Sequence, residues 1–302
     1  MEDPPLRPHP LTRSRPHPST RPGAWLSACL LLAAVPAHAQ DEAAPAADAP
    51  AARALPLWEF GVFGLGVSQQ AYPGSDQQVS RGLVLPYLIY RGRYLRADQE
   101  SAGLRAIKTP RFELDVGFAG AFGARSDDLD ARRGMPDLGT LVEFGPRVKW
   151  NLGRGPGGGA WRLELPLRGV FDLSDGGRHK GMTFEPRLVF QRQSSTGWAY
   201  STSLSAIVAD ARLARTFYGV EPRFALADRP AYEARSGLVA WRLSTAVSRQ
   251  LSPDWRVFAL GRLDTVQGAA NEASPLVRQR TGASVGLGVT YTWMRSERLA
   301  SD

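Results

Sequence analysis

Apolar and polar residues alternate along much of the chain between residues 57 and 293, in segments of about ten to fourteen residues separated by Gly, Pro, Asp and Ser clusters. In the clearest segment, 281–293, Ala, Val, Leu, Tyr and Trp alternate with Gly, Ser and Thr. The segments 112–118, 142–151 and 161–172 alternate apolar residues with charged ones. A period of two predicts strands with one apolar and one polar face, and ten residues is the length that a tilted strand needs to cross a bilayer.

Two features favour a transmembrane barrel over a soluble β-sandwich. The polar parity carries full charges of both signs, which a dry sandwich core would exclude. Aromatic residues stand near the strand ends on the apolar parity, as in an interfacial girdle: Trp58, Trp150, Trp161, Trp198, Tyr291 and Trp293. We therefore predict an all-β fold, an antiparallel transmembrane β-barrel whose apolar face points outward to lipid.

The segments predict about twelve strands. Ten or fourteen remain alternatives, because two of the strands are short and 217–227 could supply another. The connections alternate between short and long, which predicts short periplasmic turns, long external loops and both chain ends on the periplasmic side. The predicted strands are 58–71, 81–91, 93–98, 103–108, 111–123, 138–151, 160–172, 181–193, 197–209, 236–250, 254–266 and 280–293.

Four prolines fall inside these strands: Pro86, Pro146, Pro166 and Pro186. Proline cannot donate a hydrogen bond to the ladder, and a closed barrel has no edge strand in which that donor would not be needed. We expect local β-bulges at these positions, which would shift the inward and outward parity beyond them.

Residues 1–39 resemble an export signal, with a basic start, an apolar run from Ala24 to Val35 and a small-x-small site at 37–39. Cleavage would leave a flexible Ala/Pro-rich tether at 40–56, the barrel at 57–293 and a tail at 294–302. Cys29 lies in the middle of the apolar run, which argues against a lipoprotein processing site. These segments predict a protein of the outer membrane of a Gram-negative bacterium, exported by a cleaved signal peptide.

The mature chain has no cysteine, which excludes disulfides and thiol chemistry. It keeps 33 basic and 27 acidic residues, a net charge of +6, and these are spread through every segment. Nucleic-acid binding would require them to cluster on one face, so lipid headgroups or the cell-wall polymer are the expected partners and nucleic acid is not.

Candidate catalytic residues are few. His179 is the only histidine of the mature chain and lies in a cationic turn, so a lipid-modifying enzyme that uses it as a base is a minor hypothesis. Asp127, Asp128 and Asp130 lack the spacing of a calcium loop and are better explained as solvated loop charges. We expect no enzyme activity, no metal and no cofactor.

The charges on the inward parity would meet across a narrow lumen, either as an anion-favouring pore or as a plug of paired side chains. We favour the plug, because acidic and basic residues recur on adjacent strands at similar depth. These charges are Glu113, Asp115, Glu143, Arg147, Glu164, Arg168, Glu185, Arg187, Arg242, Arg256, Arg262 and Asp264.

Several strings resemble the MipA/OmpV family of outer-membrane proteins, and together they span roughly residues 57–293. They comprise AYPGSD at 71–76, LPY at 85–87, FYGV at 217–220, RPAYEA at 229–234, SPLV at 274–277 and GLGVTY at 286–291. The residues that carry the resemblance are Tyr72, Gly74, Ser75, Asp76, Pro86, Tyr218, Pro230, Tyr232, Ser274 and Pro275.

The resemblance implies a scaffold that docks a murein lytic transglycosylase and a murein synthase for peptidoglycan remodelling. An outer-membrane channel or an adhesin with functional external loops is the alternative. Our predicted topology places most of the family strings in external loops, whereas murein enzymes work in the periplasm.

Overall fold

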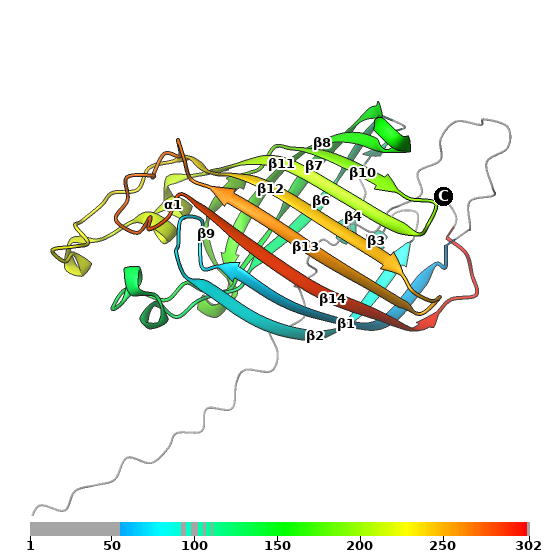
Figure 1. Ribbon diagram of the computed structural model, residues 1–302, viewed down its shortest axis with the longest axis horizontal. Helices are drawn as coiled ribbons and strands as arrows, with labels where there is room; N and C mark the ends of the chain where they lie inside the picture. The colour runs from blue at the N-terminus through cyan, green and yellow to red at the C-terminus, as the bar shows by residue number, and fades with distance from the viewer. Residues whose placement is uncertain (1–54, 92–94, 98–101, 105–106, 110, 301–302) are drawn as a thin grey trace, which may run out of the picture.

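The computed structural model describes residues 55–300 apart from 92–94, 98–101, 105–106 and 110. The predicted signal peptide and almost all of the tether lie outside the described residues. The described strands form one sheet that curls into a barrel (Figure 1). They are β1 (Trp58–Gln70), β2 (Gln78–Arg91), β3 (Leu95–Ala97), β4 (Ala102–Leu104), β5 (Ile107–Lys108), β6 (Phe112–Ala121), β7 (Leu141–Arg154), β8 (Ala160–Asp172), β9 (Arg178–Phe184), β10 (Arg187–Gln193), β11 (Trp198–Ala209), β12 (Gly237–Gln250), β13 (Trp255–Thr265) and β14 (Thr281–Arg295).

The strand pairing among the described residues is antiparallel throughout, and β1 pairs with β14. The sheet runs from β4 through β1 and β14 round to β5, and its two ends are consecutive in the chain. β9 and β10 both pair with β8 and β11, so they are two halves of one strand that is interrupted at 185–186. β4 and β5 occupy the range of one predicted strand. When β4 and β5 are counted as one strand, and β9 and β10 as another, the barrel has twelve strands, which confirms the prediction.

The barrel has two different ends (Figure 1). At one end, which we call the loop end, lie the connections 71–77, 122–140, 173–177, 210–236 and 266–280. At the other, the turn end, lie the shorter connections 155–159, 194–197 and 251–254. The tail also lies at the turn end, where the backbone of 296–300 hydrogen-bonds to that of residues 55–58.

The region 217–227, considered above as an extra strand, is not one. The connection between β11 and β12 holds helix α1 (Ala211–Tyr218) and a 3-10 turn, Pro222–Phe224. Asp210 caps α1, because its Oδ1 accepts a hydrogen bond from the Leu213 amide at 2.8 Å. Only the first two residues of 217–227 belong to α1, and the rest forms a loop with the 3-10 turn and with isolated bridges that join Val220 to Tyr232 and Leu226 to Arg229.

The expectation of a bulge at each proline is wrong. Pro86 pairs in register with Val62 and lies in the part of β2 that pairs only with β1 among the described residues, so its missing amide costs no ladder bond there. Pro146 and Pro166 leave the register of β7 and β8 unshifted, and Pro186 interrupts the strand between β9 and β10. The register shifts lie elsewhere, at Phe60/Gly61, Asn151/Gly153, Val170/Phe171 and Ile207/Val208.

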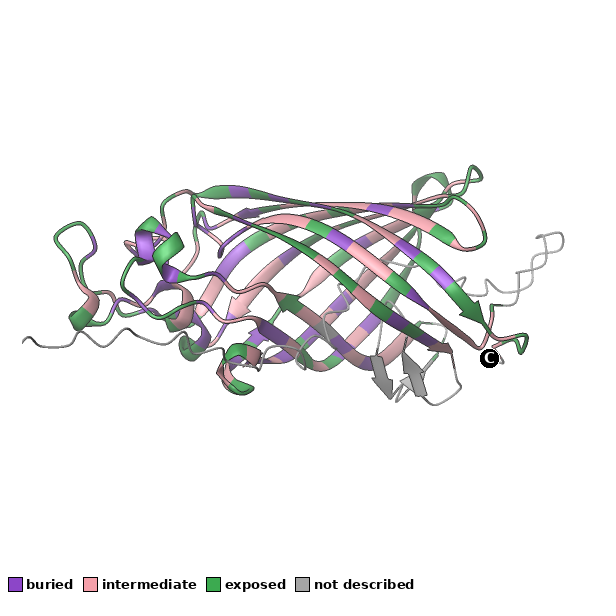
Figure 2. Cartoon of the chain, turned by 90° about the horizontal axis from the view of Figure 1, so that it is seen from below, coloured by how far each residue is buried: buried purple, intermediate pink, exposed green. Residues whose placement is uncertain are grey.

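The apolar parity faces outward. Val84, Leu287 and Trp293 are 73%, 70% and 68% exposed, whereas Arg168, on the opposite parity, is 1% exposed. Exposed and less exposed positions alternate along the strands (Figure 2). Of the six predicted girdle aromatics, Trp150, Tyr291 and Trp293 are exposed and the others half-buried. The strands of a barrel hydrogen-bond the backbone N–H and C=O groups of their neighbours, as crossing the hydrocarbon of a bilayer requires. The aliphatic side chains then contact lipid, and the charges lie inside.

Candidate functional site

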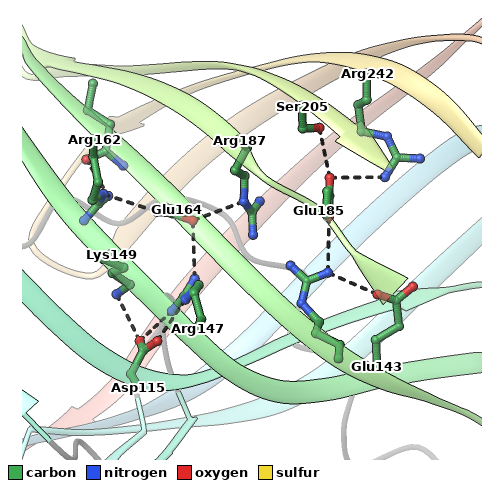
Figure 3. Close-up of polar contacts among 12 residues, drawn as sticks. Asp115, Glu143, Arg147, Lys149, Arg162, Glu164, Glu185, Arg187, Ser205 and Arg242 are labelled. Carbon is green, nitrogen blue, oxygen red and sulfur yellow. Dashed lines mark hydrogen bonds and ion pairs between the residues drawn. The ribbon is translucent and has the colours of Figure 1, made fainter. Parts of the chain in front are cut away.

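The bore of the barrel holds a network of ion pairs, which we call the ionic network. Its first group surrounds Glu164 of β8, whose carboxylate lies 3.1 Å from Arg187, 3.2 Å from Arg162 and 3.8 Å from Arg147. Arg147 also forms a two-pronged pair with Asp115, at 2.9 and 2.6 Å, and Lys149 lies 3.0 Å from the same carboxylate. Figure 3 shows these side chains converging from β6, β7, β8 and β10. Neighbouring strands therefore share each charge.

The second group of the ionic network lies nearer the loop end. Arg168 of β8 contacts Glu143 of β7 at 3.1 Å and Glu185 at 3.2 Å. Glu185 also accepts a hydrogen bond from Ser205 of β11 at 3.0 Å and lies 3.9 Å from Arg242. Arg242 in turn forms a two-pronged pair with Asp264 of β13, at 2.7 and 2.9 Å. The second group therefore links β7 and β8 to β11, β12 and β13 across the interruption between β9 and β10.

Ten of the twelve lumen charges that the sequence predicts form ion pairs in this network, Glu113 by its pair with Lys149. Arg256 and Arg262 form no ion pair within the described part of the chain. The Arg256 Nε donates to Gln250 at 2.8 Å, and Arg262 stands beside Arg242 on the bore face of β13. Lys149 and Arg162 were not singled out as lumen charges, although their parity matches that of Arg147 and Glu164. The side chains of the first group come from four strands and those of the second connect five, and Glu164, Arg168 and Glu185 each have several partners. They support the interpretation of a plug of paired side chains.

A second assembly, the loop cap, covers the loop end and is built from the family strings. The Tyr72 hydroxyl donates to the carbonyl of Leu276 at 2.8 Å, and the Tyr218 hydroxyl donates to the carbonyl of Pro73 at 2.9 Å. The hydroxyl of Ser274 donates to the Tyr218 carbonyl at 2.8 Å, so each of the three segments is hydrogen-bonded to the other two. The tyrosine rings meet edge to face with centroids 6.4 Å apart. Three strings that are far apart in sequence therefore become one hydrogen-bonded unit.

The turn at 73–75 depends on glycine and on backbone hydrogen bonds. Gly74 has a φ of +93°, a conformation that other residues rarely adopt, and its carbonyl accepts the amides of Arg278 and Gln279. The Ser75 carbonyl accepts from the side-chain amides of Gln70 and Gln279, both at 2.7 Å. The positive φ explains the glycine at position 74, and the burial of Ser75 explains the small side chain at position 75.

Sequence reasoning missed three polar side chains that join the loops. Buried Arg132 donates to the carbonyls of residues 216 and 217, and buried Arg229 donates to those of 131 and 133. Burial lowers the pKa of Arg132 from its ordinary value. Asn271 accepts from the Arg235 amide and donates to its carbonyl, each at 2.8 Å. Their only signal was that they lie in or next to loops that contain family strings.

The family residues are not all in the cap interior. Tyr232 pairs through its backbone with Val220, and Pro275 follows Ser274, so both belong to the cap. Asp76 and Pro230 are exposed on its surface. Pro86 lies outside the cap, on the outward face of β2. The cap therefore collects seven of the ten residues in or against its interior.

The loop cap encloses an apolar core that crosses the bore. Its buried cluster joins Tyr72, Leu276 and Tyr218 to Val79 of β2 and Val170 of β8, which face the bore from opposite sides of the barrel. Leu276 and Val170 are fully buried. The core of the loop cap is therefore one continuous apolar cluster that reaches both walls of the bore.

The cap should loosen at high pH. Burial raises the pKa of Tyr72 from 10.0 to about 12, and it also raises the pKa of Tyr218. A raised pKa means that the folded cap favours the neutral phenol, so its contribution is complete below pH 10 and is lost as the pH rises through about 12. We expect protease cleavage of the loops to rise over that interval. Tyr72→Phe should make this step smaller without abolishing it, because Tyr218 keeps its raised pKa, and an identical pH profile for both proteins would contradict the assignment.

None of the residues considered for chemistry is placed by the described structure in a catalytic arrangement. The His179 ring lies 5.2 Å from the Phe171 ring, and its Nδ1 is 3.4 Å from the Arg212 guanidinium. Asp130 pairs with Arg133 at 2.7 Å, and no group of three or more metal-ligating side chains occurs in the described ranges. Within the same ranges no helix is long and apolar enough to cross a membrane.

Comparison with known proteins gives one family match. The family model described as MltA-interacting protein MipA matches residues 62–293. Two solved barrels are similar in fold: the NanC porin, with 10% identity, a TM-score of 0.34 and coverage of 80% of this chain and 100% of that one, and a Pseudomonas aeruginosa FadL homologue, with 8% identity, a TM-score of 0.28 and coverage of 78% and 90%. No curated protein matches the chain in sequence.

Proposed function

The chain belongs to the MipA family and is an outer-membrane barrel protein, and from this premise we propose that it is a non-enzymatic scaffold that docks murein enzymes. The docked enzymes would be a murein lytic transglycosylase and a murein synthase. The single observation that carries the proposal is the family match across residues 62–293, whose description names an interaction with MltA.

The interior of the barrel supports a scaffold over a channel. The loop cap fills one end of the bore, and the ionic network links its walls below the cap. A channel would need a continuous aqueous path, so planar-bilayer conductance of the purified barrel would favour the alternative function. An adhesin would use the exposed loop surface, and loss of surface binding on removal of 210–235 would favour that role.

We place the docking surface at the turn end. If the short turns face the periplasm, as the loop asymmetry predicts, a periplasmic enzyme reaches this end and not the loop cap. The exposed side chains there include arginines from several strands and the tail: Arg111, Arg154, Arg192, Arg249 and Arg298. Such a surface would attract an acidic face of a partner and speed its association.

Binding between purified components tests both parts of the proposal. The full mature barrel in lipid nanodiscs should bind a purified murein lytic transglycosylase saturably. Reversing the charge at Arg154, Arg192 and Arg249 together should weaken binding at least about tenfold, because three favourable charge contacts become repulsive. Reversal of three exposed loop-end arginines, Arg212, Arg223 and Arg278, is the matched control and should leave binding unchanged.

The outcomes separate the two claims. Absence of saturable binding would overturn the scaffold role. Weakening by the loop-end set alone would keep the scaffold role and overturn the placement of its surface.

A further inference from the structure

Three rings form a row on the outside of the barrel near its loop end, and we call them the aromatic row. They come from neighbouring strands: Phe144 of β7, Phe171 of β8 and His179 of β9. The rings of Phe144 and Phe171 stack with centroids 4.8 Å apart, and the His179 ring lies 5.2 Å from that of Phe171. Phe171 alternates with the buried Val170 and Asp172, and His179 pairs with Phe171 in register. The aromatic row therefore faces away from the bore.

The outward face on the turn-end side of the aromatic row is apolar. Leu167 pairs with Phe184 there, and Gly169 pairs with Met182. The side chains of Leu167, Phe184 and Met182 are exposed. A methyl group added at Gly169 would run into the Phe171 ring, so this ring lies over the glycine and extends the same surface. An acyl chain of the bilayer would contact these side chains.

Helix α1 brings a cation to the aromatic row. The Arg212 Nη1 lies 3.4 Å from Nδ1 of His179. The start of α1 is tied to β9, because the Asp210 amide donates to the Met182 carbonyl at 3.1 Å and the Met182 amide donates to Oδ2 of Asp210 at 3.0 Å. Figure 1 shows α1 and β9 together at the loop end. Since His179 faces outward, the guanidinium that contacts it also lies on the outside of the barrel.

The charge of Arg212 is not neutralised by any carboxylate in the part of the chain that the structure describes, and the residue is exposed. The carboxylates of the neighbouring segments have other partners. Asp210 accepts two backbone amides, and Asp172 and Asp175 both pair with Lys180, at 3.2 and 3.1 Å. A cation of this kind at the edge of a lipid-facing surface favours contact with anionic headgroups.

The contact between Arg212 and His179 determines which donors remain for a ligand. A guanidinium can only donate, so Nδ1 of His179 accepts in this hydrogen bond and the ring proton lies on Nε2. Neither side chain makes another hydrogen bond among the described residues. The Nε2–H of His179 and the other N–H groups of Arg212 are therefore available side by side. A phosphate monoester, with three acceptor oxygens, can accept from both residues at once.

We propose that the aromatic row and Arg212 form a binding site for a phosphorylated glycolipid of the lipid A class. A phosphate monoester on its sugar is held by Arg212 and His179, and an acyl chain lies along Leu167 and Met182. The loop asymmetry predicts that this end faces the outer leaflet, whose lipid in a Gram-negative bacterium carries sugar phosphates. A phospholipid headgroup is a phosphodiester, which has fewer free oxygens and less charge to offer. The site lies at the opposite end of the barrel from the docking surface and is independent of the docking role.

Native mass spectrometry of the full mature barrel tests the proposal. The barrel is released from detergent in the presence of purified lipid A, of dephosphorylated lipid A or of phosphatidylglycerol. We expect saturable binding of lipid A and binding at least about tenfold weaker for the other two lipids, because only lipid A offers the phosphate monoester. Equal affinity for dephosphorylated lipid A would overturn the proposal, because acyl chains alone would then account for binding. Equal affinity for phosphatidylglycerol would overturn it as well, because the site would then accept any anionic lipid.

Variants test the phosphate end of the site. Arg212→Gln combined with His179→Phe, which keeps a ring against Phe171, should weaken lipid A binding at least about tenfold through the loss of both donors. Arg192→Gln combined with Arg249→Gln is the matched control, since it removes two exposed arginines at the turn end. The control should leave binding unchanged. Unchanged binding in the first pair, or an equal loss in both pairs, would overturn the proposed site.

Photo-crosslinking locates the lipid on the wild-type barrel, without any substitution. A lipid A analogue that carries a diazirine on an acyl chain should label outward residues of 165–184, and excess unlabelled lipid A should displace it. Equal or stronger labelling of outward residues of β14, such as Val285 and Leu287, would contradict the assignment.

Discussion

Replacing Arg168 by Leu should destabilise the barrel by about 3–5 kcal/mol, the largest effect we expect from one charge. The Arg168 side chain is 2% exposed and holds Glu143 and Glu185. Its removal leaves two carboxylates facing each other in the bore without the cation that contacts both, although Arg242 and Ser205 still contact Glu185 and Arg187 lies near it. The free energy of unfolding, from reversible urea titration in detergent followed by heat-shifted electrophoretic mobility, measures the loss.

Two comparisons identify the cause of that loss. Arg178→Leu removes an arginine whose side chain is 68% exposed, so the change should be under about 0.5 kcal/mol. Adding Glu143→Gln and Glu185→Gln to Arg168→Leu should recover much of the stability, because the uncompensated charges are gone. A loss below about 1 kcal/mol for Arg168→Leu, or no recovery in the triple variant, would show that the ionic network contributes little.

Replacing Tyr218 by Ala should open the loop cap. Tyr218 is 1% exposed at the centre of the cap core, and deleting a buried aromatic side chain costs about 3–5 kcal/mol. The loss falls on the cap, because Tyr218 contacts Tyr72, Pro73 and Ser274 and lies at the end of α1. We expect rapid proteolysis within 210–236 while the strands stay folded, together with a rise in planar-bilayer conductance.

The conservative variant separates packing from hydrogen bonding. Tyr218→Phe keeps the ring and loses only the hydrogen bond to the Pro73 carbonyl, so it should cost about 1 kcal/mol and leave the loops largely resistant to protease. If Tyr218→Ala also leaves the loops protected, the cap is held by the strand ends and not by this tyrosine.

The candidate sites were predictable to different degrees. Alternation placed Glu164, Arg168 and Glu185 on the inward parity, and parity is a local property of a strand. Their partners depend on the register between strands, which alternation does not specify.

The family strings illustrate the other limit. They were recognised in the sequence, and those at 71–76, 217–220, 229–234 and 274–277 were correctly placed in connections between strands, but as separate pieces. The Tyr72 hydroxyl bonds to a residue 204 positions away, and that of Tyr218 to one 145 positions away. Loops have no repeating pattern from which such contacts could be predicted.

The sequence by itself indicated about twelve strands and determined the outward apolar face and the inward charge, because each segment alternates with a period of two and the bilayer requires the apolar face outside. The tertiary structure alone decided which charges pair and that the loops meet as a cap. These features arise from contacts between segments far apart in the chain, which form only once the sheet has closed.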